Sequence, residues 1–231
     1  MRLLHDLQPD EKPISQGVYH YLRDNEPTGQ VEKWLITQAA NGAEIVRADV
    51  DGGAFSLLTH LRRRTDGKPE WLRLRYGTKN GIKAAAQYTF EEAVVQVARQ
   101  AEGQPQRLDV VDIATNYQVD YHPVISHDYV WRGYPPHARG KAWSIPVFSP
   151  DLWAEGVEAL FGRALRFNIK PLEAEDIVTP VGKFEGVRSF ETTLDDGTQA
   201  LAWYDDSGVP LRWFYPDKAY DFVLAEYKRQ D

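Results

Sequence analysis

The sequence contains no cysteine, which excludes disulfide bonds, zinc–thiolate sites and thiol nucleophiles. It also has no run of about 18 apolar residues, the length at which one helix spans a bilayer. Residues 1–6 lack the apolar stretch of about 7–15 residues that a secretory signal requires. If Met1 is the natural start we therefore expect a cytoplasmic protein, and a periplasmic one if a signal segment has been removed.

Positive charge is in short supply. The chain has 27 Lys and Arg against 34 Asp and Glu, a net charge of −7 and an isoelectric point near 5.4. A protein that neutralises nucleic-acid phosphates needs a basic face, so we predict no nucleic-acid partner. Arg62, Arg63 and Arg64 are adjacent, but neighbours on a strand point to alternate faces. The expected role of this triplet is a solvated strand end.

Motifs of the common enzymes are missing too. The sequence has no Gly-x-Ser-x-Gly elbow, no Gly-x-x-x-x-Gly-Lys-Ser/Thr loop and no Gly-x-Gly-x-x-Gly turn. Adjacent carboxylates at 195–196 and 205–206 lie in expected hairpin turns, where Asp bonds its own backbone. The sequence therefore predicts no cofactor and favours a non-enzymatic protein.

Aromatic residues and turn signals are abundant. Seven Trp and twelve Tyr suit pleated, half-buried surfaces and so favour strands over helices. Turn sequences such as Asn41-Gly42 recur every 8–12 residues between runs that alternate apolar and polar positions. Residues 91–101 fit both a helix and a strand, and their neighbours favour the strand. The pattern is typical of an antiparallel all-β meander.

We predict a single domain over residues 1–231 with three parts. An N-terminal meander covers 17–108, and a C-terminal meander covers 155–228. Between them lies a Pro-, Gly- and aromatic-rich crossing at 109–154, with a short helix at 124–131 and a helical turn at 149–153. Pro146 restricts residues 143–148 to an edge strand. The expected fold is mainly β: a strongly curved antiparallel sheet, an unclosed barrel, with the crossing over its concave face.

The C-terminal half carries a pattern of turns and strand aromatics. Residues 179–188 read TPVGKFEGVR, residues 200–204 read ALAWY, and residues 205–213 read DDSGVPLRW. This segment resembles the T-x-x-G-x-F … W-Y … G-x-P-L-R segment of bacterial uncharacterised proteins of the DUF3108 type. Those proteins resemble the LolA/LolB lipoprotein carriers, an unclosed barrel with a helical plug. The resemblance covers residues 155–228 best, and it implies the same fold without assigning any functional residue.

The crossing contains the candidate polar site. His122, His127, Asp128 and His137 are weak candidates for metal ligands. Five positions apart on a helix, His122 and His127 would point to different faces, which argues against a zinc site. Surface or hydrogen-bonding histidines are the expected alternative, and no metal is predicted. An enzyme would need His122–His137 to converge with Asp128 or Glu155 in a cleft.

The aromatic residues suggest a ligand groove or, as the alternative, an ordinary core. Apolar walls with a few polar groups describe a small-molecule or lipid-like site. We predict a β-scaffold that holds a hydrophobic or amphipathic ligand, with Arg47, Arg73 and Arg75 at the groove mouth. A structural or interaction module, with a homodimer through an edge strand as one form of it, is the second interpretation, and the oligomeric state stays open. The predicted groove residues are Tyr19, Tyr21, Trp34, Trp71, Arg73, Arg75, Tyr129, Trp131, Trp143, Trp203 and Trp213.

Overall fold

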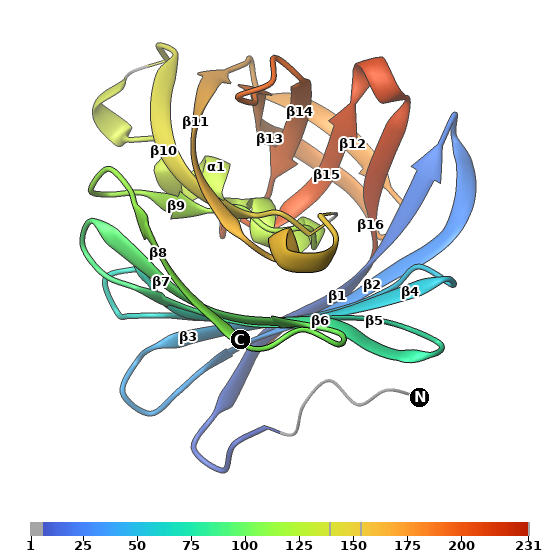
Figure 1. The fold of residues 1–231 in the computed structure, drawn as a ribbon. Coiled ribbons are helices and arrows are strands. Elements are labelled where there is room, and N and C mark those ends of the chain that lie inside the picture. The colour runs from blue at the N-terminus through green and yellow to red at the C-terminus, as the bar shows by residue number, and fades with distance from the viewer. Residues whose placement is uncertain (1–6, 139, 153, 231) are drawn as a thin grey trace.

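The computed structural model of the chain describes residues 7–138, 140–152 and 154–230. Its N-terminal part is a run of antiparallel strands joined by the tight turns that Asn, Asp and Gly favour (Figure 1). These strands are β1 (Lys12–Arg23), β2 (Glu26–Gln38), β3 (Glu44–Asp51), β4 (Phe55–Arg63), β5 (Pro69–Thr78), β6 (Gly81–Phe90), β7 (Val94–Ala101) and β8 (Arg107–Asp112).

The crossing follows β8 and contains the only α-helix of the described residues. It comprises β9 (Gln118–Val119), the 3-10 helix η1 (Val124–Asp128), α1 (Tyr129–Gly133) and the 3-10 helix η2 (Pro136–Ala138). The C-terminal part comprises β10 (Trp143–Pro150), η3 (Gly156–Glu158), β11 (Gly162–Pro171), β12 (Glu175–Thr179), β13 (Gly182–Thr193), β14 (Gln199–Tyr204), β15 (Pro210–Tyr215), η4 (Pro216–Lys218) and β16 (Tyr220–Arg229). Within the described ranges no helix is long and apolar enough to cross a membrane.

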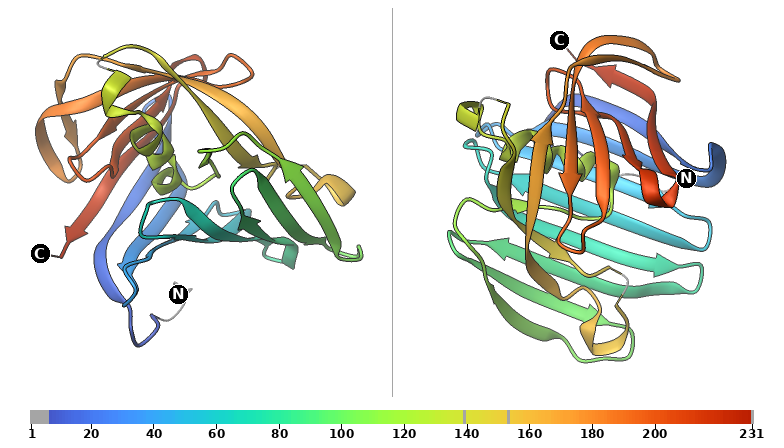
Figure 2. Two further views of the ribbon diagram at one scale, coloured as in Figure 1. Left: turned by 90° about the vertical axis from the view of Figure 1, so that its left-hand side faces the viewer. Right: turned by 90° about the horizontal axis from the view of Figure 1, so that it is seen from above.

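One curved sheet joins both meanders. Its order is β8-β7-β6-β5-β4-β3-β2-β1-β16-β15-β14-β13-β11-β10-β9, with β12 paired to β13 outside this path. The halves meet where β1 pairs with β16, so the two ends of the chain form the centre of the sheet. The sheet bends around η1 and α1, which lie on its concave side (Figures 1 and 2). This confirms the predicted mainly β, unclosed and strongly curved architecture.

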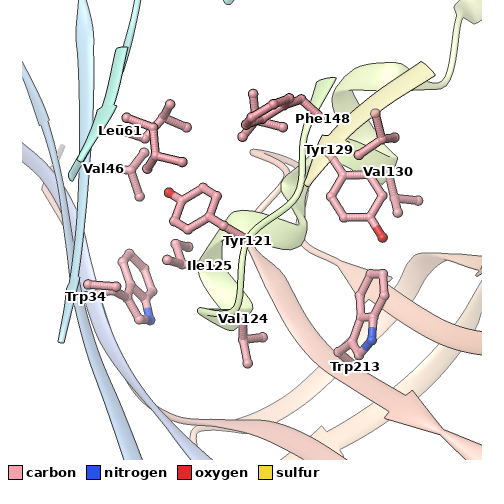
Figure 3. Close-up of a cluster of buried hydrophobic side chains, with 14 of the residues drawn as sticks. Trp34, Val46, Leu61, Tyr121, Val124, Ile125, Tyr129, Val130, Phe148 and Trp213 are labelled. Carbon is pink, nitrogen blue, oxygen red and sulfur yellow. The ribbon is translucent and has the colours of Figure 1, made fainter. Parts of the chain in front are cut away.

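The core fills the space between the concave face and the crossing (Figure 3). Trp34 on β2 and Trp213 on β15 are fully buried, and they approach Ile125 and Tyr129 of the crossing from two sides. The ring of Trp34 fits only because its cross-strand partner is Gly17, where a Cβ would lie 2.6 Å from the ring. Alternation along the strands thus delivers the large rings to one side of the sheet.

The segments with ambiguous patterns form two strands and two short helices. Residues 94–101 form strand β7, as predicted, and the short helix predicted at 124–131 is present as η1 and α1, which continue to Gly133. The edge-strand prediction for 143–148 was wrong, because β10 lies between β11 and the short parallel strand β9. The helical turn at 149–153 was also wrong over residues 149–152, since β10 continues through Pro150; Trp153 lies outside the described residues.

Candidate functional site

The polar residues predicted in the crossing separate into different environments. His122 and His127 line one cavity together. Asp128 points elsewhere and accepts hydrogen bonds from Arg63 and Arg132, both at 2.7 Å. His137 is exposed, with its ring edge-on to Trp143 at 5.3 Å. Among the residues that the structure describes, no three His, Asp or Glu side chains are grouped to hold a metal.

The predicted groove residues divide between the core and the surface. Six of them are buried in the core: Tyr19, Tyr21, Trp34, Tyr129, Trp203 and Trp213. These six rings lie in the hydrophobic core, the environment that the alternative interpretation gave them. Trp131 is half-buried beneath the Arg188 guanidinium, and Trp143 is exposed. Trp71, Arg73 and Arg75 lie on the convex face instead, around a separate groove. Their role in binding stays a prediction.

A cavity of about 510 Å³ opens at the end of the sheet where β1 finishes and β16 begins. We call it the end cavity. Its apolar wall consists of aromatic rings and aliphatic side chains from strands of both halves of the sheet and from the segment after β10. These residues are Phe55, Leu152, Leu165, Tyr215, Tyr220 and Phe222. Phe222 contacts the rings of Tyr215 and Tyr220 edge-on, at 6.0 and 4.7 Å between centroids, so this wall is a packed aromatic cluster.

Charged and polar groups complete the end cavity. Cationic side chains line it at three places: Arg23 at the end of β1, Arg163 on β11 and Lys218 in η4. Arg163 is paired with Asp151 at 2.7 Å. Asp120, Tyr121, His122 and His127 contribute the polar groups of the crossing. The cavity therefore combines apolar walls, cations and a polar group from the crossing.

Asp120 and His127 form a buried pair in this cavity. Asp120 Oδ1 lies 3.5 Å from His127 Nε2. Neither Asp120 Oδ1 nor His127 Nδ1 has a hydrogen-bond partner among the described residues, and only 16% of the Asp120 side chain is exposed. Burial raises the pKa of Asp120 to about 7 and lowers the pKa of His127 to about 3, because both charged forms are poorly solvated there. The pair thus holds one exchangeable proton over much of the acidic range.

Replacing Asp120 with asparagine should make stability depend on pH. Between about pH 4 and 6.5 the wild-type pair carries one proton in both states: on His127 in the unfolded chain and on Asp120 in the folded protein. Folding therefore takes up no net proton at this pair, and the pair adds no pH dependence to the stability. In Asp120→Asn, His127 still loses its proton on folding and no carboxyl takes one up. The free energy of unfolding therefore falls as the pH falls below the pKa of a histidine in the unfolded chain. We expect the variant to lose about 2–3 kcal/mol relative to wild type between pH 6.5 and 4.5, measured by urea unfolding. A parallel loss in both proteins would contradict the coupling.

Two buried anchors hold the crossing that carries this pair. Glu32 on β2 accepts hydrogen bonds from the backbone N–H groups of Val124 and Ile125, at 2.6 and 3.0 Å, and from the Tyr21 hydroxyl at 2.7 Å. It supplies the cap that Pro123 at the start of η1 does not provide. At the far end of η1, Asp128 is held by Arg63 and Arg132. The crossing is therefore fixed to the sheet at both ends of η1.

Several cavity residues were not singled out from the sequence. Asp120, Tyr215, Lys218 and Tyr220 come together only through the pairing of β15, β16 and the crossing. The one available signal was the short segment from Tyr215 to Tyr220, which places two tyrosines and a lysine around a turn. Turn chemistry alone did not distinguish this hairpin from the others.

Comparison with known proteins identifies the fold and no family. No protein-family model matches the chain, and no curated protein matches it by sequence. It is similar to a β-barrel-like protein of the domain of unknown function DUF1849 from Brucella abortus, with a TM-score of 0.51 and 10% identity over 95% of this chain and 98% of that one. A DUF1089 family protein from Pseudomonas aeruginosa has a TM-score of 0.46 and 16% identity over 94% and 98%. The first shows a shared β-barrel-like fold; the resemblance to the DUF3108 and LolA/LolB proteins stays a prediction.

Proposed function

We propose that the chain is a ligand-binding β-scaffold whose end cavity takes a small amphipathic molecule. The observation that carries this proposal is the Asp120–His127 pair, whose buried Oδ1 and Nδ1 atoms have no hydrogen-bond partner among the described residues of the chain. A buried polar atom costs about 1–3 kcal/mol when nothing bonds to it. A ligand hydroxyl, amide or similar group that satisfies these atoms would recover that free energy.

The walls define the rest of the ligand. The aromatic cluster around Phe222 offers ring faces and edges to an apolar or aromatic group. Lys218 and Arg23 lie over the rings of Tyr215 and Tyr220, at 5.5 and 5.3 Å, and favour an anionic or strongly polar group beside the apolar one. The volume of about 510 Å³ lies within the ordinary range of small-molecule sites. This combination supports a ligand with one apolar part and one polar or acidic part.

Binding of 8-anilinonaphthalene-1-sulfonate, an amphipathic aromatic anion, tests the proposal by fluorescence titration of the full chain. We expect saturable binding to the folded protein. Leu165→Trp fills the cavity and should weaken binding of the probe at least about tenfold. Leu108→Trp is the matched control, because Leu108 is 80% exposed on β8, away from the cavity.

Charge at the cavity gives a second readout. Lys218→Gln should weaken binding of the anionic sulfonate and leave binding of the neutral analogue N-phenyl-1-naphthylamine unchanged. Urea unfolding of each variant establishes that it is folded. The absence of saturable binding, or equal affinities for Leu165→Trp and Leu108→Trp, would reject the end cavity as the site.

A further inference from the structure

A second hollow lies on the convex face, on the other side of the sheet from the crossing. It has a volume of about 360 Å³ and spans β3, β4 and β5, with Gln8 and Glu11 of the N-terminal segment at its border. We call it the convex groove. The side chains that characterise it are Arg47, His60, Arg62, Trp71, Arg73 and Arg75. Cross-strand register explains the cluster, because Arg47 pairs with His60 and His60 pairs with Arg73.

The convex groove is basic in an acidic protein. Among the described residues, four arginines and a single carboxylate, that of Glu11, line it, while the whole chain has a net charge of −7. An opposite charge directly across the strands stabilises an exposed charged side chain on a sheet. Arg73 and Arg75 have no such neighbour: the residues directly opposite them are His60, Gln87, Leu58 and Ala85. Two exposed guanidinium groups therefore face this groove without a cross-strand carboxylate.

Arg47 supplies a buried cation beneath these exposed ones. Only 4% of its side chain is exposed, and its guanidinium donates to both oxygens of Glu11, at 2.7 and 2.8 Å, and to Thr37 Oγ1 at 2.9 Å. Its Nε is buried and has no acceptor among the described residues. A buried donor without an acceptor is costly, so one further oxygen at this group would stabilise it.

Trp71 and Arg73 are arranged for stacking as well as for charge. The Arg73 guanidinium lies 4.8 Å from the centre of the Trp71 ring, and its Nε donates to Gln87 at 3.1 Å. These contacts restrict the side chain while leaving its terminal nitrogens available for a bidentate contact. Arg62 forms an ion pair with Glu70 at 2.8 Å, so it lines the groove without offering a free charge to a ligand.

We propose that the convex groove is a binding site for a small soluble oxyanion, a phosphate monoester or carboxylate that carries a planar group. Arg73 and Arg75 bind the anion, Arg47 Nε offers a donor at the buried part of the groove, and the planar group stacks on Trp71 or the Arg73 guanidinium. A flat lipid surface would reach the exposed arginines and not the buried Arg47. This site is independent of the end cavity, which lies on the concave side.

Isothermal titration of the full chain with phenyl phosphate and with inorganic phosphate tests the proposal. We expect saturable binding of both, with phenyl phosphate tighter because its ring stacks in the groove. The double variant Arg73→Gln/Arg75→Gln should bind phenyl phosphate at least about tenfold more weakly than wild type does. Arg107→Gln/Arg166→Gln removes the same two charges from exposed positions outside the groove and should leave the affinity within about twofold. Trp71→Leu should bring phenyl phosphate to the affinity of inorganic phosphate.

Separate measurements distinguish the source of the anion and the two sites. Vesicles of phosphatidylcholine with phosphatidic acid should bind wild type and Arg73→Gln/Arg75→Gln equally weakly. The neutral N-phenyl-1-naphthylamine, which carries no anion for the convex groove, should bind that variant as it binds wild type. Failure of phenyl phosphate to saturate by about 10 mM would overturn the proposal. So would equal losses in the two double variants, or binding to the vesicles alone.

Discussion

Replacing Glu32 with alanine is expected to lower the free energy of unfolding at pH 7 by about 3–5 kcal/mol. Its carboxylate is fully buried and accepts hydrogen bonds from the backbone of Val124 and Ile125 and from the Tyr21 hydroxyl. Alanine would leave all three donors without an acceptor in a place that water does not reach. The beginning of η1 would then have no cap and would lose its attachment to β2.

Urea unfolding followed by tryptophan fluorescence measures this loss. Glu26→Ala is the matched control, since Glu26 begins the same strand in an exposed position and should change stability by less than about 0.5 kcal/mol. Burial raises the pKa of Glu32 to about 7, although its three hydrogen bonds oppose that shift. The folded protein therefore keeps a proton on Glu32 that the unfolded chain has lost, and the free energy of unfolding of wild type falls as the pH rises from about 4.5 to 7. Glutamine does not titrate, so Glu32→Gln should be less destabilised relative to wild type at pH 8 than at pH 5. A loss below about 1 kcal/mol for Glu32→Ala would contradict the anchoring role.

Local chemistry made most of the strands predictable. Asn41-Gly42 fixes the β2–β3 hairpin with Gly42 at φ of 81°, a conformation that glycine adopts without strain. The strands predicted on either side favoured a strand at β7, although its apolar spacing also fitted a helix. These features depend on neighbours within a few residues, so a single sequence contains them.

Long-range pairing was not predictable in the same way. The union of β1 with β16 joins residues about two hundred positions apart, and nothing in either strand's own pattern specifies the other. The same limit applies to the sites. Glu32 meets Val124 across 92 positions, and Asp120 shares its cavity with Tyr220 because of that central pairing. The aromatic residues were visible in the sequence, but alternation alone could not say which rings the crossing would cover.

The arginine triplet shows this limit most directly. All three residues were expected to form a solvated strand end, and for Arg63 that was wrong. Arg62 and Arg64 keep partners near the surface, Glu70 at 2.8 Å and Asp66 at 3.4 Å. Arg63 points to the concave side with 5% of its side chain exposed, and it donates to Glu44 at 2.8 Å and Asp128 at 2.7 Å. The alternation was foreseeable, whereas the buried carboxylates that meet Arg63 belong to β3 and the crossing.

Arg63→Ala is therefore expected to destabilise the protein by about 3–5 kcal/mol, the cost of leaving buried carboxylates without their partner. Asp128 would keep only Arg132, and Glu44 would lose one of the two arginines that lower its pKa against the effect of burial. Arg64→Ala is the adjacent control: 51% of its side chain is exposed and its ion pair should contribute about 0–1 kcal/mol.

Urea unfolding of the two alanine variants compares adjacent arginines of the same charge, one with buried carboxylate partners and one with an exposed partner, so the difference between them measures the effect of burying the ion pair. Because Asp128 fixes the end of η1, Arg63→Ala should also weaken 8-anilinonaphthalene-1-sulfonate binding while the protein is still folded, whereas Arg64→Ala should not. Equal stabilities of the two variants would mean that the ion pairs among Arg63, Glu44, Asp128 and Arg132 do not hold the crossing to the sheet.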